Sequence, residues 1–537
     1  MSRLVSASGS SISIQQRRRS ALRWAVLATP AVAALALAPL AHAVPLYFDA
    51  DGQEAASGGS GQWDGSLPRW ATTLGGSTYT NWTDSNDAFF TSGTIDVTGP
   101  VSPAGMHFTG DTYIRNSTGT LTLASSIIEV NTGASAFFLT TVAGAGIIKT
   151  GGGTVGFYAG GASTPTGLWD IQAGTVVLPT NNTGLTSKAV AIAGGATLDI
   201  GHSSVTSGAL SGAGSLVLGT QVQLGTITGA RFSANGDGSP SSFSGVISGV
   251  GRFQKNGTGT LTLSGVNTFS GHTTASGTLI VQGGNAIPDA HPFFTQGGAT
   301  PGTLLLNANE TVGSISGSSV LSAGALNPNG FTLSIGADNN SNAFAGRNAQ
   351  VGLESTGGIF GSGLIRKVGT GAQVIGFLGG TTATSYTGKW EVANGILAVC
   401  PSTNAGVPDA FLGAVPGAAD DSYITLSGGT FAGALTNGGS ATYAMSANRG
   451  ITVTANSGLS MYSSGLVSTL TVNGKLTGSA NLNKAGSSVV NLNNDNTASY
   501  TGDWNVTEGA IGTTSGTAVG PLGTGSVTLR GGGIMLL

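Results

Sequence analysis

Carboxylates are the side chains that could support catalysis in this sequence, but they are scattered along it. The chain has 537 residues and only 23 Asp and Glu residues. An enzyme that cleaves polysaccharides on a β-helix needs carboxylates gathered in one groove. Asp420-Asp421 is a close pair, but its position between Ala-Ala and Ser-Tyr favours a polar turn. The sequence therefore indicates no catalytic residue.

Patterns that could bind a metal ion are equally weak. Residues 49–54 (Asp-x-Asp-Gly-x-Glu) are rich in oxygen ligands, but their spacing is not that of an EF-hand loop, which favours a solvated loop. The histidines after the N-terminal region are not spaced as ligands on one element; they lie at 107, 202, 272 and 291. Cys400 is the single cysteine, which excludes an internal disulfide. We expect no metal and no cofactor.

Lysine and tryptophan recur at long intervals. Lysines stand at 149, 255, 367 and 484, and Gly-x-Trp ends at Trp169, Trp390 and Trp504. A row of lysines could contact a ligand, and tryptophans could stack on sugars. In the simpler interpretation each lysine is the last residue of a short strand. Its ammonium group is in water and the aliphatic part of its side chain lies along the protein surface. The same interpretation places each tryptophan in the core or at a corner.

Composition indicates an elongated or repetitive body rather than a disordered chain. Gly accounts for 91 residues, while charged residues make up only 8% and apolar residues 39%. Disordered segments have low hydrophobicity and high net charge, whereas the net charge here is −3. No basic stripe lies outside the N-terminal region, so we expect no nucleic-acid partner.

The first 43 residues have the pattern of a signal peptide. Arg17, Arg18 and Arg19 precede an apolar, alanine-rich run that ends in Ala-x-Ala. This pattern predicts cleavage between Ala43 and Val44, and export of the chain from a bacterial cell. A retained membrane anchor is the competing interpretation, and two prolines within the apolar run argue against it.

Short apolar runs bounded by Gly, Asn and Ser predict an all-β chain. Four segments share landmarks of Lys, Gly-x-Trp (Gly271-His272-Thr273 in the second) and a following glycine, at 144–178, 245–284, 361–399 and 478–511. The lysines of these segments, at 149, 255, 367 and 484, are 106, 112 and 117 residues apart. Repeats of short strands predict a right-handed parallel β-solenoid over 141–537, preceded by a capping β module over 44–140.

In this solenoid each rung has about 20 to 25 residues, which predicts about 20 to 25 rungs. Glycines mark the corners because they can adopt positive φ. Leu261, Leu263 and Leu279 point inward and stack on their counterparts in neighbouring rungs. The alternative is a set of tandem β-sandwiches, against which the high glycine content argues.

Residues 251–281 resemble the autotransporter-associated β-strand repeat, also called the passenger-associated transport repeat, of bacterial surface proteins. The other three segments keep only the lysine, Gly-x-Trp and glycine landmarks. The matching positions are Gly251, Phe253, Lys255, Gly257, Gly259, Leu261, Leu263, Gly265, Asn267, Phe269, Gly271, Thr273, Gly277, Leu279 and Val281.

This resemblance implies an exported, non-enzymatic passenger that is structural or adhesin-like, with repeats that assist transport and folding. Its expected location is secreted or at the cell surface. Its expected partners are the export machinery, surface glycans or other cell-surface proteins. Near Leu537 we recognise neither the alternating strands of an outer-membrane barrel nor a sorting tail, so the sequence is a fragment or is anchored by other means. A secreted polysaccharide-degrading β-helix enzyme and a calcium-dependent binding module remain alternatives.

Overall fold

The chain divides into two units, Met1–Ala43 and Val44–Leu537. The computed structural model describes residues 43–50, 58–116, 118–158, 164–179, 183–219, 230–295, 300–317, 324–344, 358–376, 385–401, 408–434, 442–462, 468–514 and 520–536. The second unit is a parallel β-solenoid of about 17 turns, and these ranges contain no α-helix. The predicted all-β fold is confirmed. Apart from Ala43, the predicted signal peptide lies outside the described residues.

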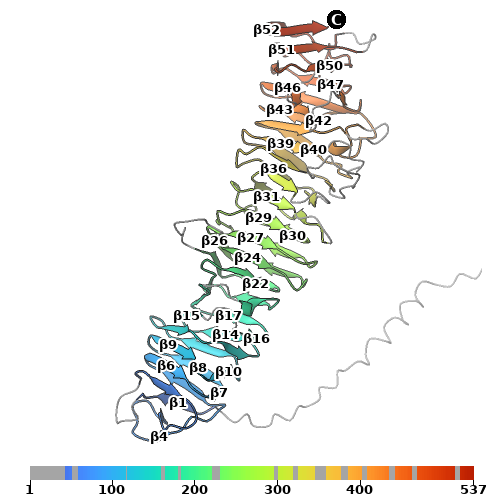
Figure 1. Ribbon diagram of the computed structural model, residues 1–537. Coiled ribbons are helices and arrows are strands. Elements are labelled where there is room, and N and C mark those ends of the chain that lie inside the picture. Colours follow the sequence, from blue (N-terminus) through green and yellow to red (C-terminus); the bar gives the residue numbers. More distant parts are fainter. Residues whose placement is uncertain are drawn as a thin grey trace, which may run out of the picture. The chain divides into compact units, whose positions relative to one another are not determined.

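The strands follow one another in chain order from β1 to β52 (Figure 1). They form six sheets, and the largest, sheet 1, has 15 strands. Its members are β1 (Pro45–Phe48), β3 (Trp70–Ala71), β4 (Tyr79–Thr80), β5 (Asp87–Phe90), β8 (Gly105–Phe108), β11 (Ile127–Val130), β14 (Ile147–Thr150), β17 (Trp169–Ile171), β19 (Val190–Ile192), β22 (Leu210–Gly212), β25 (Ser241–Phe243), β28 (Leu261–Leu263), β30 (Thr278–Val281), β32 (Thr303–Leu306) and β35 (Ala325–Asn327).

Three further sheets complete the turns of the N-terminal and central parts. Sheet 2 contains β2 (Gly61–Trp63), β6 (Gly93–Val97), β9 (Thr112–Asn116), β12 (Ser135–Phe138), β15 (Thr154–Phe157), β18 (Thr175–Val177), β20 (Thr197–Asp199), β23 (Ser215–Leu218) and β26 (Val246–Gly249). Sheet 3 contains β7 (Pro100–Val101), β10 (Thr120–Leu123), β13 (Val142–Gly144) and β16 (Thr164–Pro165). Sheet 4 contains β21 (Ser204–Thr206), β24 (Arg231–Ala234), β27 (Arg252–Lys255), β29 (Thr273–Ala275), β31 (Phe293–Thr295) and β34 (Ile315–Gly317).

Two sheets form the C-terminal part. Sheet 5 contains β33 (Glu310–Val312), β36 (Thr332–Ile335), β38 (Leu364–Lys367), β40 (Lys389–Val392), β42 (Asp420–Leu426), β45 (Arg449–Val453) and β48 (Leu476–Gly478). Sheet 6 contains β37 (Asn342–Phe344), β39 (Ala372–Ile375), β41 (Ile396–Val399), β43 (Thr430–Ala434), β44 (Thr442–Ala444), β46 (Ser457–Tyr462), β47 (Thr469–Val472), β49 (Leu482–Lys484), β50 (Val489–Leu492), β51 (Trp504–Gly512) and β52 (Val527–Leu536). Two short 3₁₀ turns, η1 (Thr183–Leu185) and η2 (Ala410–Leu412), lie between strands.

From β5 onward, strands pair in parallel with the strands one turn further along. Ser241 pairs with Leu261 and Leu261 with Leu279, which are steps of 20 and 18 residues. Other turns carry insertions, since Thr332 pairs with Leu364 and Trp390 with Ile424, steps of 32 and 34 residues. The prediction of 20 to 25 rungs is therefore wrong, because these longer turns reduce the number to about 17.

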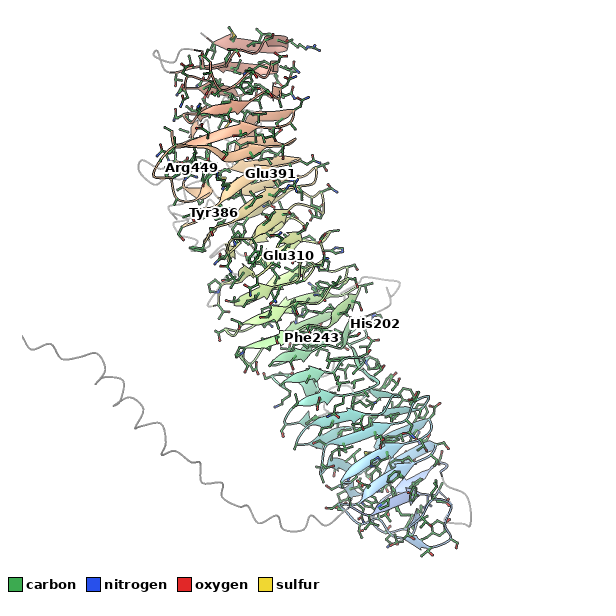
Figure 2. All side chains as sticks on the ribbon, turned by 180° about the vertical axis from the view of Figure 1, so that it is seen from behind. His202, Phe243, Glu310, Tyr386, Glu391 and Arg449 are labelled. Carbon is green, nitrogen blue, oxygen red and sulfur yellow. The ribbon has the colours of Figure 1, made fainter. Side chains whose placement is uncertain are left out.

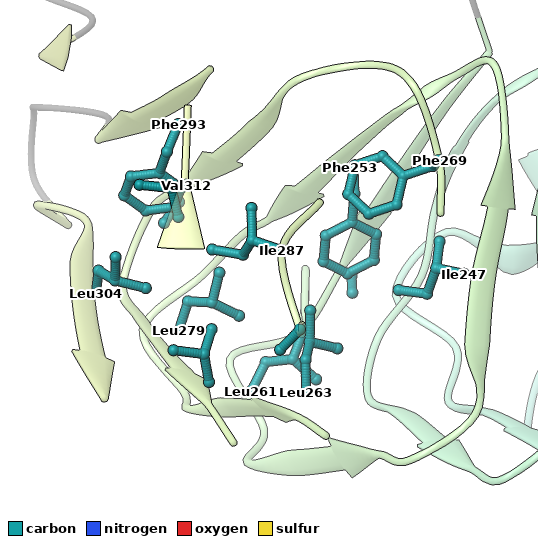
Figure 3. Packing of buried hydrophobic residues seen from close by; sticks show 14 of the residues in the cluster. Ile247, Phe253, Leu261, Leu263, Phe269, Leu279, Ile287, Phe293, Leu304 and Val312 are labelled. Atoms are coloured by element: carbon teal, nitrogen blue, oxygen red, sulfur yellow. The ribbon is translucent and has the colours of Figure 1, made fainter. Parts of the chain in front are cut away.

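The core lies between the sheets and is made of inward-facing side chains that stack from turn to turn. Strand β30 alternates half-buried and buried residues, as β-strands with one core face do. Leu261, Leu279 and Leu304 are register partners in successive turns, and all three are fully buried (Figure 3). Leu263 follows Leu261 on the same face and is also buried. The apolar residues thus form continuous rows.

An aromatic cluster lies at the N-terminal end of the solenoid. Trp70 is in β3, which pairs antiparallel with β1 and β4. Its ring lies 5.4 Å from that of Trp63 and 4.6 Å from that of Trp82, and it also contacts Phe48 and Phe90. From β5 onward the pairing is parallel and continues unbroken across residue 140. The parallel pairing of residues 87–140 thus continues into that of residues 141–537, and the division at residue 140 stays a prediction.

Glycines at the corners let consecutive turns approach closely. Gly257 and Gly277 have φ of 71° and 75°, a region that other residues rarely adopt. At the remaining glycine landmarks of this repeat, an added Cβ would overlap a backbone carbonyl oxygen of the preceding turn; these positions are Gly251, Gly259, Gly265 and Gly271. Corner glycines are therefore required by the spacing between turns.

Substituting one corner glycine should destabilise the solenoid. In Gly265→Ala the new methyl group overlaps the carbonyl oxygen of Gly245, so we expect the free energy of unfolding to fall by about 1–3 kcal/mol. Thermal unfolding followed by circular dichroism measures this change. Gly194→Ala is the matched control, because nothing lies within 4 Å of its added Cβ. Equal melting temperatures for the two variants would contradict the close approach of the turns.

Candidate functional site

The four recurring lysines lie inside the solenoid and not in water. Lys149, Lys255, Lys367 and Lys484 lie at or next to the ends of β14, β27, β38 and β49, and at most 1% of each is exposed. The Nζ atom of Lys149 donates hydrogen bonds to the carbonyl oxygens of Thr150, Gly151 and Ala173, at 2.7, 2.6 and 3.1 Å. The expectation of a strand end holds, but that of a solvated ammonium is wrong.

The same arrangement recurs at the other lysines. Lys484 bonds the carbonyl oxygens of Ala485, Gly486 and Glu508, the last of which belongs to the next turn. Lys255 and Lys367 likewise donate to the carbonyl oxygens of the two residues that follow them. These bonds satisfy carbonyl groups that face inward at a corner, which would otherwise be buried without partners.

The glycine that ends each repeat lies against both the preceding turn and the lysine. A Cβ added at Gly277, whose φ is positive, would overlap the carbonyl oxygen of Gly257 and would lie 3.1 Å from the Nζ atom of Lys255. Equivalent surroundings are found at Gly174, Gly395 and Gly509. Burial lowers the pKa of each lysine to about 8, and a carboxylate near each one opposes this shift. The lysines therefore remain charged at neutral pH. Their geometry is that of corner supports and leaves no room for a ligand.

Asn267 connects three successive turns. Its side chain is buried; Oδ1 accepts a hydrogen bond from the N–H of Ile247 at 2.7 Å, and Nδ2 donates to the carbonyl oxygen of Ala286 at 2.7 Å. Asn496 does the same between Leu476 and Pro521. The amide thus bonds the turn before it and the turn after it.

Glu310 is the first residue of β33, in the middle part of the solenoid (Figure 2), and it bonds Ile287, the residue after the one that Asn267 bonds. Its Oε1 accepts a hydrogen bond from the N–H of Ile287 at 2.8 Å, while Oε2 is buried without a partner in the described structure. Burial raises the pKa of this carboxyl to about 7, and the nearby Asp289 adds to the effect. A protonated carboxyl therefore fits this position better than a carboxylate.

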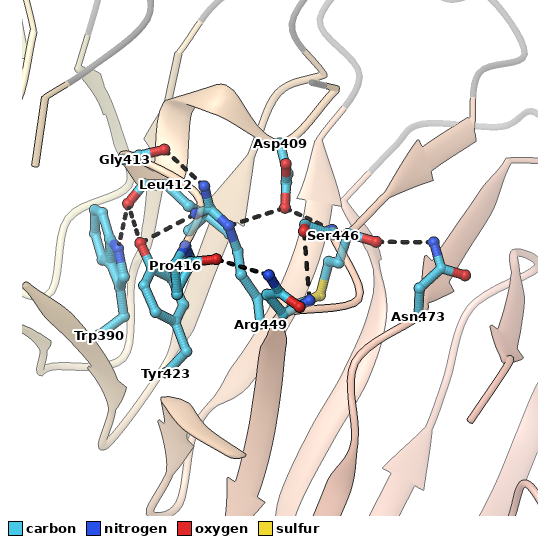
Figure 4. Close-up of polar contacts among 11 residues, drawn as sticks. Trp390, Asp409, Leu412, Gly413, Pro416, Tyr423, Ser446, Arg449 and Asn473 are labelled. Carbon is cyan, nitrogen blue, oxygen red and sulfur yellow. Dashed lines mark hydrogen bonds and ion pairs between the residues drawn. The ribbon is translucent and has the colours of Figure 1, made fainter. Parts of the chain in front are cut away.

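A closed polar network surrounds Arg449 (Figure 4). Its Nε lies 3.1 Å from Oδ2 of Asp409, and neither side chain is more than 1% exposed. The guanidinium also donates to the hydroxyl of Tyr423 and to the carbonyl oxygen of Gly413, at 3.0 and 2.6 Å. Asp409 accepts a further bond from the N–H of Ser446. This network joins Asp409 and Gly413, which precede β42, to Arg449 of β45, and its ion pair is buried.

The three Gly-x-Trp tryptophans are core residues, as the simpler interpretation predicts. Trp169, Trp390 and Trp504 are fully buried. The indole N–H of Trp390 donates to the carbonyl oxygen of Leu412, and that of Trp504 to Leu522. Stacking of these rings on sugars is therefore excluded. Cys400 is also buried, and burial raises the pKa of its thiol to about 12.

Some ionisable groups on the outer faces form ion pairs. Asp420 and Asp421 do not form a turn: they begin β42 and pair with Lys389 and Lys475, at 3.0 and 3.3 Å. One larger group lies on sheet 1, where His107 contacts Glu129 at 2.7 Å and lies 3.8 Å from Asp87.

The oxygen-rich segment near the N-terminus is only partly described. Asp49 is buried and accepts a hydrogen bond from the hydroxyl of Tyr79 at 2.7 Å, whereas Asp51 and Glu54 lie outside the described residues. Within the described ranges, no three His, Cys, Asp or Glu side chains are grouped to hold a metal ion. Across the same ranges, no helical segment is long and apolar enough to cross a bilayer.

The outer face of sheet 2 carries aromatic side chains that the sequence does not reveal as a group. The ring of Tyr113 lies 5.0 Å from that of Phe137, which lies 5.6 Å from that of Tyr158. Tyr113 and Tyr158 are 44% and 38% exposed. These three residues, from successive turns, form the outer aromatic row.

The fold defines the chain as a parallel β-solenoid protein. Over 183 residues, or 33% of the chain, it is 33% identical to the adhesin BmaC autotransporter of Brucella suis biovar 1 (strain 1330). The match covers 5% of that protein's length. No family model matches the chain, and no solved structure matches it significantly. The chain is thus distantly similar to an autotransporter adhesin, and the resemblance of residues 251–281 to the autotransporter-associated repeat stays a prediction.

Chemical labelling can test the burial of the lysines. An amine-reactive ester should modify Lys188, Lys389 and Lys475 in the folded protein, because these three side chains lie at the surface. We expect Lys149, Lys255, Lys367 and Lys484 to react at least tenfold less until the protein is unfolded. Mass spectrometry of the digested protein measures each site. Equal labelling of all seven lysines would contradict the corner geometry.

Glu310 should make stability depend on pH. Between about pH 4.5 and 7 the folded state retains a proton that the unfolded state has released, so stability falls as pH rises through this range. Its ionisation costs about 3 kcal/mol at pH 8. Glu310→Gln should therefore melt at a higher temperature than the wild type at pH 8, and at a similar temperature at pH 4.5. Glu391→Gln, on the outer face beside Arg366, is the control and should show no such gain.

Proposed function

We propose that this chain is a non-enzymatic, adhesin-like passenger, exposed at the bacterial cell surface or secreted after cleavage between Ala43 and Val44. The observation that carries the proposal is the similarity to an autotransporter adhesin, on a chain that folds as a continuous parallel β-solenoid. The repeat at 251–281 would assist transport and folding, because each completed turn offers a strand edge on which the next turn pairs.

The interior of the solenoid supports a structural role for the recurring residues. The lysines and Asn267 bond backbone groups of their own and neighbouring turns, and the recurrent tryptophans are buried. The repeat landmarks therefore maintain the scaffold, and contacts with partners would be made by side chains on the outer faces. The partners we propose are glycans or proteins of other cell surfaces.

An adhesion assay tests this proposal. Fluorescent beads coated with the purified chain should bind cultured epithelial cells at least fivefold more than beads coated with the heat-unfolded chain or with albumin. Soluble folded chain should compete for this binding. Equal binding of the folded and unfolded preparations would reject the adhesin-like function.

A parallel activity screen addresses the polysaccharide-degrading alternative. The purified chain is incubated with pectin, alginate and related glycans, and new reducing ends are measured. Asp87→Asn and Glu129→Gln test the site on sheet 1 where two carboxylates lie beside His107. Turnover by the wild type that either substitution abolishes would replace the adhesin-like function with an enzymatic one.

A further inference from the structure

The outer aromatic row follows from the strand register of sheet 2. Tyr113 in β9 pairs with Phe137 in β12, and Phe137 pairs with Gly156 in β15. Side chains at paired positions of parallel strands lie on the same face, so Phe137 and Gly156 face outward with Tyr113. The ring above Phe137 is supplied by Tyr158, two residues after Gly156.

The glycine at 156 makes room for that ring. A Cβ at this position would lie 2.6 Å from Cε2 of Tyr158 and 3.1 Å from Cδ1 of Phe137. The Tyr158 ring therefore occupies the space that a side chain of β15 would fill. Because Tyr158 remains 38% exposed, the row presents aromatic surface to the exterior.

A row of hydroxyl groups runs beside the aromatic row on the same face. Successive turns contribute one Ser or Thr each, at paired positions, and all five side chains are half-buried; they are Ser135, Thr154, Thr175, Thr197 and Ser215. None of the five hydroxyls is hydrogen-bonded to another side chain in the described part of the chain. Neighbouring hydroxyls are separated by one strand spacing, about 4.8 Å. The two rows together form the outer strip of sheet 2.

The outer strip lies beside carboxylates rather than unpaired cations: Asp111 accepts a hydrogen bond from the N–H of Ser135, a residue of the strip, at 2.9 Å. Arg115 beside it is neutralised by Asp96 through two hydrogen bonds, at 2.9 and 3.0 Å. Asp199 lies further along the row and accepts a hydrogen bond from the N–H of Gly201. A surface of this kind offers nothing to concentrate an acidic polymer, since such partners are bound by clusters of unpaired cations.

A neutral polysaccharide matches the strip better than a protein does. Pyranose rings place C–H groups on aromatic side chains, and their hydroxyls can bond a row of Ser and Thr at a similar repeat distance. A stable protein interface needs about 800 Å² on each partner around an apolar centre, whereas three rings in single file supply much less. The strip is also linear, as an extended saccharide chain is.

We propose that the outer strip of sheet 2 binds a neutral polysaccharide chain that lies across successive turns. The aromatic row contacts the faces or edges of the sugar rings, and the hydroxyl row bonds their hydroxyls. This assignment rests on the proposed adhesin-like function, because it names the chemical class of the surface that the chain would recognise.

Affinity electrophoresis tests the strip directly. The purified chain is run in native gels with increasing hydroxyethylcellulose or dextran, and polygalacturonate serves as an acidic probe. At least one neutral probe should retard the wild type. The double variant Tyr113→Ala/Tyr158→Ala and the triple variant Thr154→Val/Thr175→Val/Thr197→Val should each bind at least tenfold more weakly. Tyr462→Ala, which removes a 38% exposed tyrosine of β46, should bind as the wild type does.

Thermal unfolding shows whether each variant is folded before its affinity is compared. If the double variant unfolds, Tyr113→Ser alone, with its smaller change in packing, replaces it. Failure of both neutral probes to retard the wild type overturns the strip proposal, as does retardation by polygalacturonate alone or equal binding by all variants. Cell adhesion without retardation overturns this inference and leaves the adhesin-like function standing. Retardation without cell adhesion supports binding at the outer strip and rejects the adhesin-like function.

Discussion

Parallel pairing between one turn and the next is the interaction on which the whole structure depends. It sets neighbouring turns about 4.8 Å apart along each sheet. At that spacing a corner residue with a Cβ would meet the backbone of the preceding turn, as the environment of Gly265 shows. The same spacing places equivalent side chains directly above one another, such as Leu261, Leu279 and Leu304. Corner glycines and apolar rows are consequences of one geometry.

Buried polar groups obey the same constraint. Carbonyl groups that point inward at a corner need donors, and a lysine at the end of a strand supplies three from one nitrogen. Asn267 satisfies an N–H below it and a carbonyl above it, because an amide carries both an acceptor and donors. Ionisation of Glu310 would place a negative charge away from water, which is why burial raises the pKa of its carboxyl. The chemistry of each interior polar group thus follows from the groups above and below it.

These relations explain which features the sequence could predict. Strands, corner glycines and inward leucines leave local patterns in composition and alternation, so they are visible without a structure. The depth of Lys255 is not visible, because a lysine that ends a strand is usually solvated and its acceptors come partly from a residue 21 positions away. Asp420 and Asp421 were expected in a turn because their neighbours are small and polar. Their pairing with Lys389 and Lys475 depends on turns of irregular length.

The outer strip of sheet 2 illustrates the same limit for function. Thr154, Thr175 and Thr197 are separated by 21 and 22 residues, and only the register of β15, β18 and β20 brings them into one row. A change of one residue in any turn would move a threonine to the core face and an apolar residue outward. The residue types of the interior rows are therefore constrained by the stability of the fold. The residues of the exterior rows are held in place by the same register but contribute little to that stability. In a solenoid, residues that maintain the scaffold recur along the sequence, while residues free to recognise a partner are aligned only by the fold.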